Sequence, residues 1–137
     1  MLLTTNYSLV KILALDIGTK RTGVAYTDET LGFPIALETI HHRSKKEFLE
    51  AVLEIVRAKK IEHVVVGIPY LPSGEEGSQA AIVREYAALL EAKNIPLSTV
   101  DERYSTGRKV APRAGVPGSG NPDSEAAIAI LDTFLSY

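Results

Sequence analysis

The first strongly apolar stretch of the chain covers residues 10–15, VKILAL, in which both alternating sets of positions are mostly apolar. Such a run predicts a strand that is covered on both faces. Asp16 falls at or near the carboxyl end of this strand. Gly18 and the polar residues after it predict the turn of a hairpin, because a second apolar run starts at Gly23.

A third strand-like run, LGFPIALETI, covers residues 31–40. Pro34 favours an edge position, because proline has no N–H to donate to a ladder. Three strands joined by short turns predict an antiparallel meander. His41 and His42 follow this run. Since neighbouring strand residues face opposite ways, the two histidines make a poor metal pair, and we expect both to be exposed in a loop.

The rest of the chain alternates between helical and strand-like patterns. The predicted elements are helices over residues 44–60 and 79–93, strands over residues 63–68 and 97–100, and a last helix that starts at Asn121-Pro122. Ser44 and Glu47 form a capping box at the start of the first helix. The strand HVVVGI, residues 63–68, has the continuous apolar character of a buried parallel strand.

This order of elements, β-β-β-α-β-α-β-(α)-α, is that of the ribonuclease H-like fold. We therefore expect an α/β protein with a five-stranded mixed sheet, three antiparallel and then two parallel strands, flanked by helices. The 137 residues suit a single domain over residues 1–137. In this fold the first strand lies in the middle of the sheet, and acids from a later strand and from the last helix join the acid at its end.

Composition narrows the class of protein. Apolar residues make up 45% and charged residues 23% of the chain, which is ordinary for a soluble globular protein. No run of about 18 apolar residues predicts a membrane span, and the start MLLTTNYSLV lacks the pattern of a signal peptide. The chain has no cysteine, which excludes disulfides and thiolate metal sites. We expect a cytoplasmic protein with no membrane partner.

Acidic residues near the ends of three predicted elements carry the candidate chemistry. A carboxylate at the end of a buried strand, as at Asp16, is costly unless a cation balances it, so a metal ligand and a turn cap are equally open. Asp101 and Glu102 face opposite ways, so only one of them can join a site over the sheet end. Asp123 lies on the sheet-facing side of the last helix, although the helix dipole also favours a first-turn Asp.

Basic residues flank these acids. The candidate phosphate-binding residues are Lys20, Arg21, Arg103, Arg108 and Lys109. Residues 103–122 contain no acid at all. Because the net charge is −2, nucleic-acid binding would have to rest on such a local patch. The alternative is that these charges are solvated and serve solubility.

Four motifs, in order and at compatible spacing, resemble the YqgF family, also called RuvX. They are LALDIGTKRTGVAYTD, VVVGIPYLPSGEEGSQA, the DER that begins at Asp101 and the DSEAAIAIL that begins at Asp123. The resemblance covers residues 12–135. It implies a catalytic and metal-binding triad of Asp16, Glu102 and Asp123. Three carboxylates suit Mg²⁺ or Mn²⁺, and they can hold two ions that hydrolyse a phosphodiester bond.

The function expected from this resemblance is a metal-dependent endonuclease that processes the 5′ end of pre-16S ribosomal RNA. One alternative is a Holliday junction resolvase that acts on four-way DNA. Another is a catalytically silent nucleic-acid-binding or ribosome-assembly module, which stays open because GVPGSGNP, residues 115–122, replaces most of the family's basic loop. DIGTKRTGVA also looks like a phosphate loop of actin and sugar kinases, which need two such domains. Expected partners are ribosomal RNA precursor or branched DNA, and a second copy of the chain is a further candidate.

Overall fold

The computed structural model describes residues 10–102 and 122–136, with the side chains of all but residues 122–124. One mixed sheet has the order β3-β2-β1-β5-β6, and β4 also pairs with β2. The strands are β1 (Ile12–Ile17), β2 (Arg21–Thr27), β3 (Ile35–Ala36), β4 (Ile40–His41), β5 (His63–Ile68) and β6 (Leu97–Asp101), and the helices are α1 (Lys45–Lys59), α2 (Ser78–Glu91) and α4 (Pro122–Leu135).

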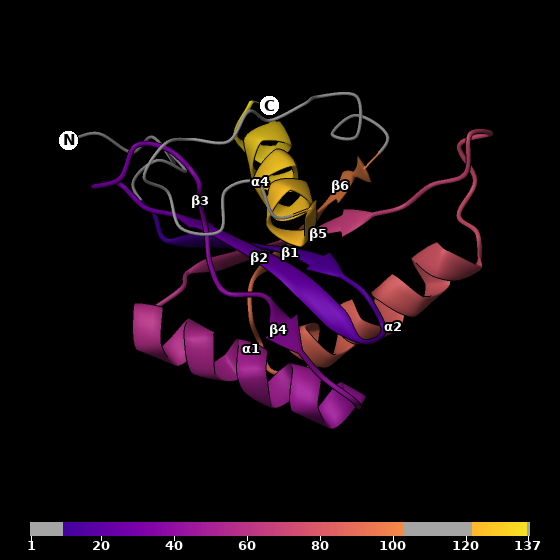
Figure 1. Ribbon diagram of the computed structural model, residues 1–137, viewed down its shortest axis with the longest axis horizontal. Coiled ribbons are helices and arrows are strands. Elements are labelled where there is room, and N and C mark those ends of the chain that lie inside the picture. Colours follow the sequence, from indigo (N-terminus) through magenta and orange to yellow (C-terminus); the bar gives the residue numbers. More distant parts are fainter. Residues whose placement is uncertain (1–9, 103–121, 137) are drawn as a thin grey trace.

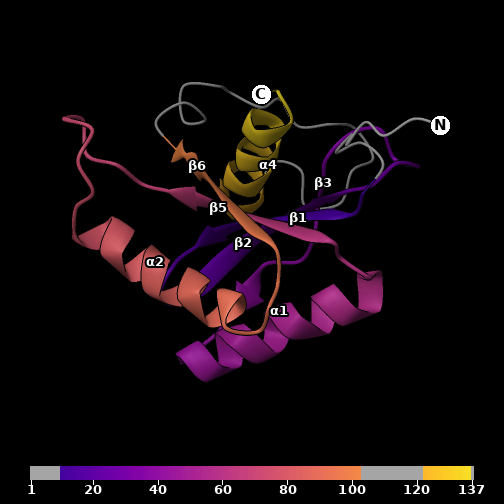
Figure 2. The same cartoon turned by 180° about the vertical axis from the view of Figure 1, so that it is seen from behind.

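The elements form three layers, with α4 on one face of the sheet and α1 and α2 on the other (Figure 1). The view from behind shows the same arrangement (Figure 2). Strand β1 lies in the middle, antiparallel to β2 and parallel to β5, which in turn runs parallel to β6. The predicted α/β class and the central place of the first strand are confirmed. None of the helices in the described segments is long and apolar enough to span a membrane.

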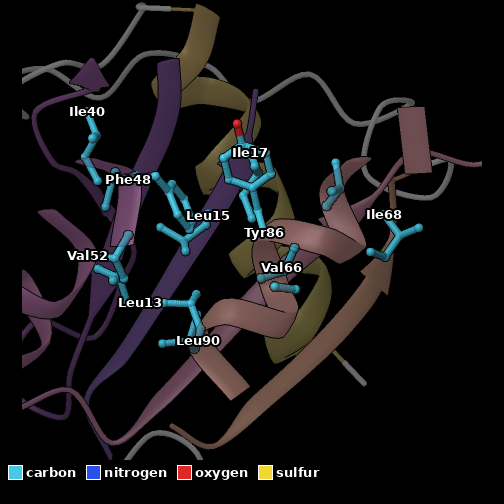
Figure 3. Packing of buried hydrophobic residues seen from close by; sticks show 14 of the residues in the cluster. Leu13, Leu15, Ile17, Ile40, Phe48, Val52, Val66, Ile68, Tyr86 and Leu90 are labelled. Carbon is cyan, nitrogen blue, oxygen red and sulfur yellow. The ribbon is translucent and has the colours of Figure 1, made fainter. Parts of the chain in front are cut away.

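Both faces of β1 are covered, as its sequence predicts. Leu13, Leu15 and Ile17 pack with residues of α1 and α2, such as Phe48, in the larger core cluster (Figure 3). The alternate residues of β1 join a second cluster with α4, whose members include Ile12, Ala14, Ala127, Ile130 and Leu131. Since side chains alternate along a strand, the residue after Leu15 points to the α4 face.

The prediction of one continuous strand over residues 31–40 is wrong. The segment forms two short strands, so the sheet has six strands rather than five. Three residues between β3 and β4, residues 37–39, lie opposite only Gly23 and Val24 of β2. This one-residue excess is a β-bulge, which shifts the register and exchanges the two faces. Pro34 precedes β3 at the edge of the sheet, where the sequence placed it.

The bulge explains why the expectation for one of the two histidines is also wrong. His41 is exposed, but His42 is only 2% exposed. Beyond the bulge, Ile40 joins the core cluster under α1 and α2, whereas Ala36 before it belongs to the α4 cluster. The ring of His42 follows Ile40 to that face and meets Phe48 edge-on, with 5.4 Å between ring centroids.

The helices lie close to their predicted limits, and α1 shows why. Ser44 has an extended backbone, and its hydroxyl accepts the N–H of Glu47 at 3.1 Å. The carboxylate of Glu47 reaches back to the backbone N–H of Arg43, at 2.7 Å, rather than to that of Ser44. This is the predicted capping box, except that the Glu47 carboxylate accepts from the residue before the N-cap instead of from the N-cap itself. At the other end Lys60 adopts the left-handed conformation, with φ 55°, which stops the helix.

Replacing the cap of α1 tests this account. Ser44→Ala removes the acceptor for the Glu47 N–H and should lower the free energy of unfolding by about 1 kcal/mol. Ser44→Asn keeps a capping acceptor and should stay near the wild-type value. Urea unfolding of the three proteins checks this, and equal stability of Ser44→Ala and wild type would show that the cap contributes nothing.

Candidate active site

Asp16 is the next-to-last residue of the central strand β1 and is half-buried on the α4 face. It lies opposite Gly23 of β2 in the hairpin. The turn that follows is tight, because the N–H of Gly18 donates to the carbonyl of Arg21 at 3.0 Å. A Cβ atom at residue 18 would lie 2.6 Å from that carbonyl oxygen, so only glycine fits. The turn thereby fixes the position of Asp16 at the carboxyl end of the central strand β1.

Glu102 follows directly after β6, two strands away from Asp16, with β5 between them. Its side chain crosses β5 above Gly67. A Cβ atom at Gly67 would lie 2.7 Å from Oε1 and 2.8 Å from Cγ of Glu102. The missing side chain of Gly67 is therefore the space that the Glu102 side chain occupies. On the far side of β5 the carboxyl group of Glu102 forms a hydrogen bond with that of Asp16.

This contact strongly perturbs the protonation of Glu102. Burial, followed by the negative charge of Asp16, the hydrogen bond with Asp16 and the charge of Asp101, raises the pKa of Glu102 to about 8. Two carboxyl groups can form a hydrogen bond only if one of them carries a proton. Without a cation, the pair therefore holds a proton at neutral pH.

The register decides between the two acids at the end of β6. Val100 belongs to the core cluster under α4, and Glu102, two residues later, lies on the same side. Asp101 pairs with Ile68 and points to the opposite face of the sheet. Of the two candidates, Glu102 is the one that reaches Asp16.

The third predicted ligand and most of the predicted phosphate-binding residues are not among the described side chains. Asp123 is the second residue of α4, and its side chain lies outside the described set. Arg103, Arg108 and Lys109 also lie outside the described residues. Lys20 lies in the turn after β1 and Arg21 is the first residue of β2, and both are exposed. Within residues 10–102 and 125–136, no three acidic or histidine side chains gather closely enough to hold a metal ion.

The two carboxyl groups nevertheless fit a hard divalent cation. Their oxygens are the ligands that Mg²⁺ prefers, and Mg²⁺ needs few protein ligands because it keeps several waters. A cation there would also replace the proton that the pair must otherwise hold. The sequence alone does not indicate the part that Gly67 plays. A glycine inside a strand of β-branched residues indicates a close approach of another group. The register of β5 with β1 and β6 is needed to show that this group is the side chain of Glu102.

Filling the space at Gly67 should disturb the site. In Gly67→Ala the new methyl group meets Glu102 and also Ile130, whose Cδ1 would lie 2.5 Å away. We expect a loss of about 1–3 kcal/mol in unfolding free energy from overpacking, together with weaker Mg²⁺ binding in calorimetric titration.

The double variant Gly67→Ala/Ile130→Val separates these two effects. It removes Cδ1 of residue 130 but leaves the collision with Glu102. Stability should therefore recover in part, while Mg²⁺ binding stays weak. Recovery of Mg²⁺ binding along with stability would mean that Glu102 is not held in place by the gap at Gly67.

The raised pKa of Glu102 makes stability depend on pH when metal is chelated. The folded protein keeps the proton up to about pH 8, whereas the usual value is 4.5. The folded state thus binds more protons between these limits, so unfolding free energy falls as pH rises through the window, by at most roughly 1.4 kcal/mol per pH unit. Glu102→Gln cannot ionise and should lose this fall. Denaturant titrations across the window check it, and an equal fall in both proteins would contradict the assignment.

Comparison with known proteins finds relatives along nearly the whole chain. A relative named "Putative pre-16S rRNA nuclease" from a Synechococcus strain is 36% identical, covering 98% of this chain and 85% of its own. A protein of the same name from Maridesulfovibrio salexigens is 32% identical, covering 93% and 98%.

Solved structures agree on the fold. RuvC of Thermus thermophilus, in complex with a Holliday junction substrate, aligns with a TM-score of 0.63 at 12% identity, over 93% of this chain and 94% of RuvC. A second Thermus thermophilus RuvC structure gives 0.58 at 14% identity, over 92% and 95%. Such low identity shows the shared ribonuclease H-like fold alone. The family model "RuvX: Holliday junction resolvase" matches residues 10–137. The chain therefore belongs to the RuvX family.

Proposed function

We propose that the protein is a metal-dependent nuclease that hydrolyses phosphodiester bonds at the pair formed by Asp16 and Glu102. The observation that carries this proposal is the contact of the two carboxyl groups across Gly67 at the carboxyl end of the central strand. A purely structural protein gains nothing from this contact, because two partly buried acids held together must take up a proton or carry repelling charges, and either costs stability. A cation bound between them removes that cost.

Each residue has a definite task in this proposal. Asp16 and Glu102 hold Mg²⁺ or Mn²⁺, and Asp123 at the start of α4 is proposed as the third ligand. Bound there as a pair, the ions would lower the pKa of a water and stabilise the leaving oxygen. Glu102 gives up its proton when the cation binds, so the site loads more readily as pH rises toward 8. Lys20 and Arg21 at the turn are proposed to hold phosphate groups next to the acids.

The proposed substrate is the precursor of 16S ribosomal RNA, cut at its 5′ end. The names of the curated relatives favour it, and such a substrate would fit the expected cytoplasmic location. The basic stretch at residues 103–122 is proposed to contact its backbone, although it lies outside the described structure. A four-way DNA junction is the second candidate, favoured by the description of the family. A cleavage assay must therefore offer both substrates side by side.

Asp16→Asn should abolish cleavage of whichever substrate wild type cuts. The change keeps size and shape but removes a negative ligand, so Mg²⁺ binding weakens, and we expect a loss of at least about 10²-fold in rate. Wild-type cleavage should require Mg²⁺ or Mn²⁺ and stop in excess chelator. Ca²⁺ should support it poorly, because it takes more ligands at longer distances.

Glu50→Gln is the matched control, since it removes one exposed carboxylate from α1. It should cleave like wild type. Circular dichroism confirms that both variants are folded. Near-normal turnover by folded Asp16→Asn would refute the role of Asp16. Absence of cleavage by wild type on both substrates, with nucleic-acid binding intact, would instead identify a silent binding module.

A further inference from the structure

A cavity of about 640 Å³ lies on the face of the sheet opposite to the acid pair. It is lined by Thr19, Lys20, His41, His42, Arg43 and Glu47. These residues come from the β1–β2 turn, from β4 and from the first turn of α1. The N–H of His42 donates to the carbonyl of Lys20 at 3.0 Å and ties the two walls together. The cavity is too large for a single phosphate group and falls within the usual size of small-molecule sites.

One wall of the cavity is a fixed imidazole. The Nε2 atom of His42 is hydrogen-bonded to the hydroxyl of Thr22 at 2.9 Å, and Phe48 and Tyr86 contact its ring. Burial lowers the pKa of His42, so the ring is neutral at neutral pH. Its Nδ1 atom is buried and has no hydrogen-bond partner among the described residues. This atom has almost no accessible surface, so the accessible groups at the cavity are the side chains of Lys20, His41 and Arg43 rather than Nδ1.

The rim of the cavity is cationic. The side chain of Arg43 is 91% exposed and pairs with Glu47 at 3.4 Å. Exposed pairs of this sort contribute little, so the guanidinium can turn to a phosphate at small cost. The Glu47 carboxylate is already fixed by the backbone N–H of Arg43 at 2.7 Å. The negative charge of Glu47 balances one of the two cations, Arg43 and Lys20. The rim therefore keeps a net positive charge.

The position of the cavity connects it to the proposed active site. Lys20 is four residues after Asp16, across the tight turn, so the two residues lie at most roughly 13 Å apart along the chain. A nucleic-acid strand held at the acid pair and passing over the turn would reach the cavity within a few nucleotides. Histidine rings are among the side chains on which unpaired bases stack, and arginine and lysine bind the phosphates between them.

We propose that this cavity holds one unpaired nucleotide of the substrate strand, with its phosphate on Lys20 and Arg43 and its base against the exposed ring of His41. The inference rests on the proposed function, since it assumes a nucleic-acid substrate. It adds a binding site on the second face of the sheet and a preference for a single-stranded segment near the cleaved bond. A base-paired nucleotide would not fit, because its partner strand would have to enter the same cavity.

Binding assays in excess chelator test this without cleavage. The probes are a short single-stranded oligonucleotide, a blunt duplex of the same length and a nucleoside monophosphate. Arg43→Ala should weaken single-strand binding roughly tenfold and make the slope of log affinity against log salt shallower by roughly 0.7. His41→Ala should weaken it too, but leave the salt slope unchanged, because stacking of a base on a ring involves no phosphate contact and no counterion release. Duplex affinity should not change in either variant.

Lys46→Ala is the control, because it removes one exposed charge from the first turn of α1 outside the cavity. It should bind the single strand like wild type. An Arg43→Ala protein no different from this control would overturn the proposal. So would an equal loss on the duplex, which indicates backbone contacts alone, or monophosphate binding as tight as the oligonucleotide, which indicates a free-nucleotide site.

The same design separates the two proposals. If wild type cleaves with Mg²⁺ but the variants bind normally, the cavity proposal fails and the nuclease remains. If the variants lose single-strand binding while wild type does not cleave either substrate, the cavity stands and the nuclease fails.

Discussion

The contact between the carboxyl groups of Asp16 and Glu102 depends on the pairing and packing of the whole centre of the sheet. It requires three neighbouring strands in one register, since Leu15 pairs with Val66 and Gly67 with Val100. A slip of one residue in β6 would turn Glu102 to the other face of the sheet. It also requires a residue without a side chain at the point where Glu102 crosses β5. The apolar packing on both faces of β1 and β5 holds this register in place.

A second constraint is the bulge in the strand that follows the hairpin. In a regular strand without the bulge, Ile40 and His42 would point to the same face as Ala36, which is the α4 face. With the extra residue, His42 enters the core under α1 and α2, and His41 points out to solvent. One inserted residue at the sheet edge thus shapes the wall of the cavity on that face. The acid pair on the other face does not depend on it.

The sequence predicts what depends on local pattern and misses what depends on pairing. Periodicity and capping residues give the helices within a few residues, because these signals lie within each element. The apolar character of β1 gives its central place. The bulge was invisible, since residues 31–40 alone do not show which residues of β2 they face. The role of Gly67 was not predictable either. Gly67 leaves space for the side chain of Glu102, which must cross β5 to reach Asp16, and only the pairing of β1, β5 and β6 shows this. Alternation did predict that only one of Asp101 and Glu102 could join the site.

The acid pair and the cavity lie on opposite faces of the sheet, yet both are fixed by the same hairpin. The turn after β1 is tight and requires a glycine at residue 18, because any side chain there would collide with the carbonyl of Arg21. A longer turn would move the carbonyl of Lys20 away from the N–H of His42, which donates to it at 3.0 Å. The tightness of this turn therefore does two things at once. It fixes the end of β1 at Asp16, and it holds the carbonyl of Lys20 in place for the N–H of His42 on the other face.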